Sequence, residues 1–408
     1  MKIAIIGGGA AGMMAAATIA ESNLKNSIII LEKNDSLGRK VSLSGGGRCN
    51  LTTTITDLST LVDNYPRGNK WIKYALHNFN PKKCRQWFES HNIPLKVEKN
   101  KVFPKSDNSK DIIDMFIRVF KKNNVKINYR KSVEKIGISE NKFKLLINDG
   151  TNIRADKVVI ATGGRIYNSK EDTVDGYNLA ENLGHKVTKL AKSLSSFITN
   201  NKIVHKLAGL SFGNVKMKLI GLNSYKISGP LLFTHIGVSG PGIFSLSSLS
   251  AFEKCDESNK LQLFIDFLPE LGYKELTKKI EKLIKENPKS KSTNTFVKLV
   301  PKSIIEVILN ILKIDISIKN SELSKKNINR IVENLKNFEL QIIGRTPGSE
   351  IVTAGGVDLN EVKSKTMESK IVPGLFFAGE ILDVDGFTGG FNLQNAWATG
   401  RLAGENIT

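Results

Sequence analysis

The feature that most constrains the fold is a glycine-rich turn, GGGAAG at residues 7–12, between an apolar run and an Ala- and Met-rich segment. The run 2–6 is typical of a short buried strand, and residues 10–20 of a helix packed closely on a sheet. In such a GxGxxG turn Gly7 permits the tight turn, Gly9 lets the backbone approach a pyrophosphate, and Gly12 allows close helix–strand packing. The helix N-terminus would then point its free N–H groups at the phosphates.

An acidic residue follows at the distance that dinucleotide binding requires. Residues 27–31 predict a second strand that ends at Glu32, about twenty residues beyond the last glycine of the turn. A carboxylate there can accept hydrogen bonds from the hydroxyls of an adenosine ribose. The two strands and the helix between them form a βαβ unit with a right-handed crossover. This unit suits either NAD or FAD.

Three further segments favour FAD. VVIATGG at 158–164 resembles the segment by which two-domain flavoproteins return to the nucleotide-binding sheet, and VPGLFFAGE at 372–380 resembles the C-terminal flavin motif of the glutathione-reductase-type fold. In that motif the acidic residue, here Glu380 or the nearby Asp383, approaches the ribityl chain. GGFNLQ at 389–394 precedes an Ala-rich helix, whose N-terminus would face the flavin O2/N1 edge and stabilise the anionic reduced flavin. Both chain ends therefore contribute to one FAD domain.

The expected fold class is α/β: a discontinuous, Rossmann-like FAD domain of residues 1–189 and 346–408, with an inserted mixed domain at 190–345 that faces the substrate or RNA. The insertion is expected to hold strands of a second sheet at 212–220 and 261–267, followed by a helical part at about 270–340. Residues 33–54 are too long for a simple connection and indicate a ligand-binding loop. Expected helices also include 81–91, 111–123, 273–286, 303–312 and 321–335; further strands are expected at 126–129, 143–147 and 157–160.

The charge balance is unusual. The chain of 408 residues has 60 Lys and Arg against 39 Asp and Glu, a net charge of +21, with a sequence pI near 9.7. Such a field is typical of nucleic-acid binders, although a general bias toward Lys, Asn and Ile would also raise the lysine content.

The three cysteines, Cys49, Cys84 and Cys255, form no CxxC pair and no metal-ligand cluster, which fits a reducing cytoplasm and excludes a disulfide reductase of the CxxC type. The sequence shows no secretory signal pattern and no apolar run of membrane-spanning length. We therefore expect a cytoplasmic protein without a metal or a membrane partner.

The most distinctive segment is LGRKVSLSGGGRCNLT at 37–52. Its glycines allow close passage over a planar ring, while Arg39, Lys40 and Arg48 can pair with phosphate or flavin carbonyls. With ATGG at 161–164 and FAGEILDVDGFTGGFNLQNAWATG at 377–400, this segment resembles the BaiN/RdsA family of FAD-dependent oxidoreductases (the YhiN-like flavoproteins). LFTHIGVSGP at 232–241 and TAGGV at 353–357 also match. The resemblance covers nearly the whole chain, but the lysine-rich helices of 270–340 carry no matching motif.

The motifs together define a set of candidate FAD contacts. These residues are Gly7, Gly9, Ala11, Gly12, Glu32, Lys33, Arg39, Lys40, Ser44, Gly45, Gly46, Arg48, Asn50, Val133, Ala161, Thr162, Gly163, Gly379, Glu380, Asp383, Gly390, Phe391, Asn392 and Leu393. A second GxGxxG is absent from the sequence, so NAD(P)H would dock only transiently against the flavin.

The resemblance implies two alternative substrates. One branch of the family is implicated in making dihydrouridine in the large-subunit (23S) ribosomal RNA, and the other reduces bile-acid intermediates. The charge favours the RNA branch, because a steroid reductase has no use for +21. A small-molecule enone reductase and a non-catalytic, flavin-containing RNA-binding protein remain alternatives. The sequence leaves the oligomeric state open.

Reduction of a uracil C5–C6 bond requires a proton donor, and two residues are candidates. Cys49 follows the glycine loop and carries a transferable proton, but it could equally be a buried packing residue. His235 precedes a Gly/Ser/Pro turn where an imidazole could reach a substrate, or it could simply hydrogen-bond the backbone. Basic residues that could hold RNA phosphates, or that are merely solvated, are Lys82, Lys83, Arg85, Lys121, Lys122, Arg130 and Lys131.

Overall fold

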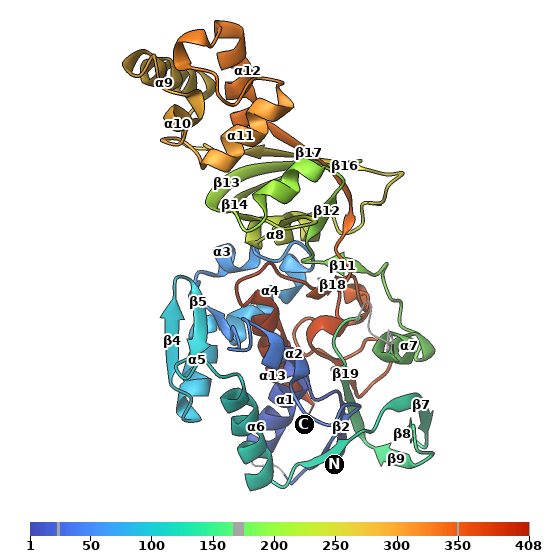
Figure 1. Ribbon diagram of the computed structural model, residues 1–408. Coiled ribbons are helices and arrows are strands. Elements are labelled where there is room, and N and C mark those ends of the chain that lie inside the picture. Colours follow the sequence, from blue (N-terminus) through green and yellow to red (C-terminus); the bar gives the residue numbers. More distant parts are fainter. Residues whose placement is uncertain (23–24, 166–174, 349–350, 408) are drawn as a thin grey trace. The chain divides into compact units, whose positions relative to one another are not determined.

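The computed structural model describes residues 1–22, 25–165, 175–348 and 351–407 (Figure 1). The chain divides into two compact units. The first comprises Met1–Lys192 with Val352–Thr408, and the second Ser193–Ile351. The sequence had placed the corresponding boundaries at 190 and 346. Each unit has its own buried hydrophobic core.

The first unit is built on a five-stranded parallel sheet in the order β19-β10-β1-β2-β6. Its strands β1 (Lys2–Ile6), β2 (Ser27–Glu32), β6 (Lys126–Tyr129) and β10 (Lys157–Ile160) come from the first part of the chain, whereas β19 (Leu375–Phe377) comes from the last. The three central strands and β19 are apolar and largely buried, as parallel strands covered on both faces must be. This arrangement confirms the predicted α/β class and the Rossmann-like sheet.

Helices α1 (Ala10–Glu21) and α13 (Phe391–Asn406) pack against each other along small residues. A Cβ added at Gly400 would lie 2.3 Å from the Ala11 carbonyl oxygen, and one at Gly404 would lie 2.8 Å from the Thr18 Cβ. Helix α13 also buries Trp397, whose indole N–H donates to the Leu51 carbonyl at 3.0 Å. Helix α13 therefore ties the C-terminal segment to the first βαβ unit.

Smaller elements complete the first unit. The segment 33–54, expected as a loop, contains helix α2 (Arg39–Leu43) and strand β3 (Thr52–Thr53). Strand β3 pairs with β5 (Lys101–Pro104), which pairs with β4 (Leu95–Glu98); β7 (Val133–Ser139), β8 (Lys142–Ile147) and β9 (Asn152–Ala155) form an antiparallel sheet, and β11 (Ala191–Ser193) pairs with β18 (Val352–Ala354). The remaining elements are α3 (Leu58–Val62), α4 (Asn69–Asn78), α5 (Pro81–Ser90), α6 (Lys110–Lys122), α7 (Asp175–Asn182), η3 (Leu359–Glu361) and η4 (Gly379–Ile381).

The second sheet expected from the sequence is a closed barrel in the second unit. Its strands run in the order β12-β15-β14-β13-β16-β17. Closure depends on β17 (Phe338–Arg345), which pairs with both β16 (Leu261–Asp266) and β12 (Phe197–Thr199). Such a pairing between distant segments has no local sequence signal. The other strands are β13 (Ser211–Ile220), β14 (Ser224–Phe233) and β15 (Gly237–Ser239).

The helices of the second unit lie close to their expected positions. They are η1 (Lys202–Leu207), α8 (Pro241–Leu249), α9 (Tyr273–Glu286), α10 (Ser292–Phe296), α11 (Lys302–Ile311), η2 (Asn320–Glu322) and α12 (Lys325–Lys336). Helix α12 begins at Lys325 rather than at 321, because Ser324 caps it by accepting the Asn327 N–H. In the part of the chain that the structure describes, no helix combines the length and apolarity needed to cross a bilayer.

The approach of α13 to α1 leads to a stability prediction. Gly400→Ala forces a methyl group against the Ala11 carbonyl, and overpacking of this kind costs roughly 1–3 kcal/mol. We expect a lower thermal midpoint and less bound flavin per chain. Gly137→Ala is the matched control, because its nearest neighbour would lie 4.0 Å away. Equal midpoints for the two variants, measured by circular dichroism, would contradict the packing argument.

Candidate flavin-binding site

The glycine-rich turn leaves an open cradle at the start of α1. Gly7 has φ +102°, and a Cβ on it would lie 2.5 Å from the Ala161 carbonyl oxygen; a Cβ on Gly12 would lie 1.9 Å from the Gly7 carbonyl oxygen. A Cβ on Gly9, by contrast, would meet no atom within 4 Å. Gly9 caps α1 without a side-chain hydrogen bond, and the first intrahelical bond runs from the Met13 N–H to its carbonyl. The first N–H groups of α1 thus border a space that a pyrophosphate could enter.

The Glu32 carboxylate lies at the C-terminal end of β2, close to this turn. It is 6% exposed. Its Oε2 accepts the Gly8 N–H at 2.7 Å, and its Oε1 accepts the backbone and side-chain N–H groups of Asn34 at 2.8 and 2.6 Å. The next residue, Lys33, reaches the Asp175 carboxylate at 3.9 Å. The acid is therefore held beside the glycine turn, as ribose recognition requires.

The segments that follow β10 and β19 meet β1 at the same edge of the sheet. After β10, the Thr162 hydroxyl is buried and finds no hydrogen-bond partner in the described part of the chain, and Gly163 adopts φ +79° with open space at its Cβ position. After β19, Gly379 adopts φ +80° and donates its N–H to the Thr399 hydroxyl at 2.9 Å. A Cβ on Gly379 would lie 2.7 Å from the Ala11 Cβ. Ligands of open α/β sheets bind at such an edge, beyond the carboxyl ends of the strands.

Glu380 joins three distant segments at this edge. Its Oε2 lies 2.7 Å from the Lys40 Nζ of α2, and its Oε1 accepts the Thr353 N–H at 2.9 Å. A Cβ on Gly164 would lie 2.4 Å from the same Oε1. The sequence predicted both Lys40 and Glu380 as flavin contacts, but it gave no sign that they pair or that Thr353 holds the carboxylate.

The turn before α13 is held by hydrogen bonds and close packing of its own residues. Asn392 accepts the Gly386 N–H at 2.8 Å and donates to the Gly386 carbonyl at 2.7 Å, so its amide shapes the turn. Gly390 has φ +91°, and a Cβ there would lie 2.6 Å from the Thr52 backbone. Phe391 is buried and accepts the Tyr65 hydroxyl on its carbonyl, whereas Leu393 is half-buried. The start of α13 is thereby fixed against the segment that follows the SGGGRCN motif.

The residues of the SGGGRCN loop differ in their backbone conformations and in their hydrogen-bond partners. Gly45 and Gly46 have positive φ, and the Cβ position of Gly46 is open. Ser44 caps the end of α2 and hydrogen-bonds the Val41 carbonyl. The Asn50 Oδ1 atom is buried without a hydrogen-bond partner.

Arg48, Arg39 and Val133 have different surroundings in this structure. Arg48 pairs with Glu98 at 2.9 Å and with Asp107 at 3.4 Å, and its guanidinium lies over the Phe103 ring. Arg39 donates to the Asn34 Oδ1 at 3.4 Å. Val133 is buried at the start of β7. Arg48 is thus already engaged by carboxylates in this structure.

Asp383 lies in a cluster that the sequence did not indicate. Its Oδ2 accepts the Thr188 hydroxyl at 3.0 Å, while its Oδ1 is buried without a hydrogen-bond partner. Burial raises the pKa of this carboxyl above its ordinary value, although Thr188 and Arg67 oppose the shift. Arg67 itself forms an ion pair with the buried Asp385. Arg67 and Thr188 belong to no motif, and only the fold brings them to the DVDG segment.

The two candidate proton donors differ in exposure. Cys49 is fully buried, and this burial raises the pKa of its thiol to about 12. The thiol therefore stays protonated at neutral pH and has no surface that a substrate could reach. His235 is exposed in the turn between β14 and β15. The packing interpretation of Cys49 fits this structure better than the catalytic one.

The residues of the first unit fit a flavin dinucleotide. The open position at Gly9 admits a pyrophosphate, and a carboxylate is held beside it at Glu32. The oxygens of Asn50, Thr162 and Asp383 are buried and have no hydrogen-bond partner among the described residues, which is costly unless a ligand or water satisfies them. The set is dispersed in the sequence but gathered at one edge of the sheet.

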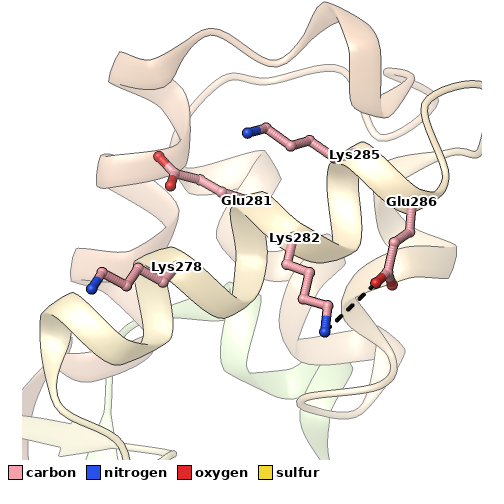
Figure 2. A pocket seen from close by; sticks show the side chains of 5 residues that line it. All are labelled: Lys278, Glu281, Lys282, Lys285 and Glu286. Carbon is pink, nitrogen blue, oxygen red and sulfur yellow. Dashed lines mark ion pairs between the residues drawn. The ribbon is translucent and has the colours of Figure 1, made fainter.

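A pocket on the helical part of the second unit carries none of these residues. Figure 2 shows its lining, five side chains of α9: Lys278, Glu281, Lys282, Lys285 and Glu286. Lys282 and Glu286 form an ion pair at 3.9 Å, and all five lining residues carry charged side chains. Among the described residues, no group of three or more His, Cys, Asp or Glu side chains could hold a metal ion. The described residues therefore offer no alternative cofactor or metal site.

A family model described as the HI0933-like protein Rossmann domain matches residues 1–406. The chain belongs to this family. It is 30% identical to the 3-dehydro-bile acid delta(4,6)-reductase of Clostridium scindens, over 99% of this chain and 98% of that protein. It is equally 30% identical to the ribosomal RNA dihydrouridine synthase of Escherichia coli, over 99% and 97%, and 31% identical to that of Haemophilus influenzae, over 99% and 98%. The BaiN/RdsA resemblance is thus confirmed.

Solved structures share the fold at low identity. The 3-ketosteroid-delta4-(5alpha)-dehydrogenase of Rhodococcus jostii aligns with a TM-score of 0.53 and 13% identity, over 99% of this chain and 96% of that one. The 3-ketosteroid delta1-dehydrogenase of Sterolibacterium denitrificans aligns with a TM-score of 0.52 and 13% identity, over 99% and 98%. These matches agree with the Rossmann-like architecture, and family membership supports an FAD-dependent oxidoreductase.

The cradle at Gly9 can be tested without disturbing the fold. Gly9→Ala has no clash and an extended backbone, so we expect an unchanged thermal midpoint. Its methyl group would occupy the phosphate position and weaken FAD binding by about tenfold, which corresponds to ~1.4 kcal/mol. Gly12→Ala clashes with the Gly7 carbonyl, and we expect it to lower the midpoint as well. FAD titration followed by flavin fluorescence, together with melting curves, separates the two effects; full FAD affinity in Gly9→Ala would contradict the cradle.

Proposed function

We propose that this protein is an FAD-dependent reductase that converts a uridine of 23S ribosomal RNA to dihydrouridine, with NAD(P)H as the electron source. The observation that carries the proposal is the net charge of +21. Relatives of equal identity are named for two different substrates, a bile acid and ribosomal RNA. Charge distinguishes these substrates, because only RNA is a polyanion.

The positive charge is not confined to one part of the chain. Lys and Arg outnumber Asp and Glu in both units. Contacts between such side chains and phosphates provide most of the non-specific affinity for nucleic acids. A pocket for one steroid would need no charge of this kind. The distribution supports a large anionic substrate that contacts an extended surface.

The candidate site assigns separate tasks to the residues of the first unit. The N-terminus of α1 and the open position at Gly9 would hold the pyrophosphate, while Glu32 would bind the adenosine ribose. Glu380, positioned by Lys40 and the Thr353 N–H, would contact the ribityl chain. When bound, FAD supplies the hydride that the uracil C6 atom accepts. The start of α13 would stabilise negative charge on the flavin ring.

The target uridine must leave its stack to reach a buried flavin, as for other enzymes that modify bases. Basic residues would then hold the surrounding phosphates. Of those suggested by the sequence, Lys82, Lys83, Lys121, Lys122 and Arg130 are exposed and available. Lys131 forms an ion pair with Asp149 and is a poorer candidate, and Arg85 is half-buried. Such contacts position the RNA and carry no sequence information.

The exposed His235 is the better candidate for the acid that protonates uracil C5. The buried Cys49 thiol has a pKa raised to about 12 and offers its proton to no exposed surface. We expect His235→Gln to lower the turnover of FAD-loaded protein by about 10²-fold, the lower end of general-acid contributions. Cys49→Ala serves as the matched variant and should retain turnover once its FAD content is matched. The reverse pattern in single-turnover reduction of an RNA transcript would assign the proton to Cys49.

The reaction itself is tested by mass spectrometry of 23S ribosomal RNA nucleosides from cells with and without this gene. We expect one dihydrouridine to disappear on deletion and to return with the wild-type protein. It should return less fully with Gly9→Ala, because that variant is expected to fold but to bind FAD more weakly. Unchanged dihydrouridine in cells that normally express the protein would refute the proposal.

Reduction of a small enone is the second candidate, because one relative is named as a bile-acid reductase. The discriminating measurement is NAD(P)H oxidation by the FAD-loaded protein with a 3-dehydro-bile acid that carries delta(4,6) double bonds. Robust turnover, together with unchanged 23S dihydrouridine, would favour this function. RNA binding without loss of dihydrouridine on deletion would instead indicate a non-catalytic role.

A further inference from the structure

The helical part of the second unit carries many lysines that lack acidic partners. Among the described residues of helices α9 to α12 and their connections, ion pairs join Lys282 to Glu286, Lys302 to Glu306 and Lys336 to Asp266. The exposed lysines of the α9–α10 connection and of the segment between α11 and η2 form no such pair within the described chain. These two connections lie within the helical group drawn beyond the barrel in Figure 1.

The two connections run side by side and place lysines opposite each other. Lys291 and Lys319 are partners in an antiparallel β-bridge. The Ser292 N–H donates to the Ile318 carbonyl at 2.9 Å, and the Asn320 N–H donates to the Ser290 carbonyl at 3.0 Å. Directly opposite residues project from the same face, with Cβ atoms about 5 Å apart, and like charges in such a pair are destabilising. Both lysines are exposed, as is Lys289 two residues earlier.

The nearby carboxylates are occupied by other groups. Asp315 Oδ1 accepts the Ser317 N–H and hydroxyl, each at 2.8 Å. Glu322 Oε2 accepts the Lys319 backbone N–H at 3.0 Å. Neither acid forms an ion pair with a lysine within the described residues. Asp315 nevertheless lies near enough for the charge of Lys291 to help lower the pKa of its carboxyl, after the hydrogen bonds from Ser317, so this acid offsets part of the repulsion without forming an ion pair.

A buried amide prevents the two backbones from separating. Asn320 is 1% exposed, and its Nδ2 donates to the Asn287 carbonyl at 2.6 Å and to the Thr295 hydroxyl at 2.7 Å. Because these bonds join Asn320, the first residue of η2, to the end of α9 and to α10, they hold the backbones that carry Lys291 and Lys319 together. A rigid, exposed cationic group of this kind is preorganised for an external anion.

We propose that Lys289, Lys291 and Lys319, the lysine platform, bind the sugar–phosphate backbone of the RNA substrate. The inference rests on the proposed function and adds a docking surface to it. The platform is exposed, and its neighbouring lysines lie on an open surface. This arrangement suits the successive phosphates of a nucleic-acid chain. A single free phosphate would instead require an enclosing set of donors, and the described residues of the platform provide none.

The test compares two double variants that remove the same charge from the same helical group. Lys291→Gln/Lys319→Gln removes two of the three platform lysines, while Lys282→Gln/Lys302→Gln removes two lysines that already pair with glutamates. Binding of an unmodified 23S ribosomal RNA transcript is measured at several salt concentrations. Each phosphate contact in a single strand contributes roughly 0.7 to the slope of log K against log salt, so the platform variant should lose about 1.4. Thermal midpoints and FAD content report folding, and relief of like-charge repulsion should leave the midpoint at least as high.

The outcomes separate the platform from the function on which it rests. A reduced slope in the platform variant, with the control variant close to wild type, supports the platform. Equal losses of slope in both variants would show that only the overall charge matters and would overturn the platform proposal. An unchanged slope in the platform variant would overturn it too, while wild-type RNA binding and 23S dihydrouridine would still support the proposed function. No salt-dependent RNA binding by the wild type would refute both.

Discussion

The contact of α13 with α1 is the interaction on which the first unit depends. The backbones approach so closely at Gly400 and Ala11 that no side chain fits between them. This contact brings the C-terminal segment against the first βαβ unit, and β19 then extends the sheet beside β10. Through the same contact Gly379 reaches Ala11, and Glu380 reaches Lys40. The candidate site exists only where these distant segments meet.

The architecture of the first unit was accessible from the sequence because its signals are local. A glycine turn between an apolar strand and a small-residue helix identifies a βαβ unit from about thirty residues. The ATGG and FAGE segments each carry a strand followed by glycines with positive φ, at Gly163 and Gly379. Glycine at these positions indicates a positive φ from the sequence alone. The pairing of their strands follows from the parallel sheet.

The parts that sequence did not reveal depend on contacts between distant residues. The barrel closes because β17 pairs with β12. The alternation of buried and exposed residues along a strand is the same in an open sheet, so it does not indicate this closure. The sequence suggests that Arg48 binds a phosphate. In the structure Arg48 forms ion pairs with Glu98 and Asp107, which lie in a neighbouring hairpin and turn. Arg67 and Thr188 became part of the site only when the fold placed them near Asp383 and Asp385. The burial of Cys49 similarly depends on what packs around the loop.

The division of the first unit between both chain ends has a consequence for biosynthesis. During translation the residues of the second unit, Ser193–Ile351, are complete before β19 and α13 leave the ribosome. Domains generally fold as units, so the inserted barrel can fold while the flavin-binding unit still lacks an edge strand and its central helix. Until then β10 lacks its neighbour β19 on one side, and α1 lacks its contact with α13. The candidate flavin site is therefore complete only after α13 has been synthesised.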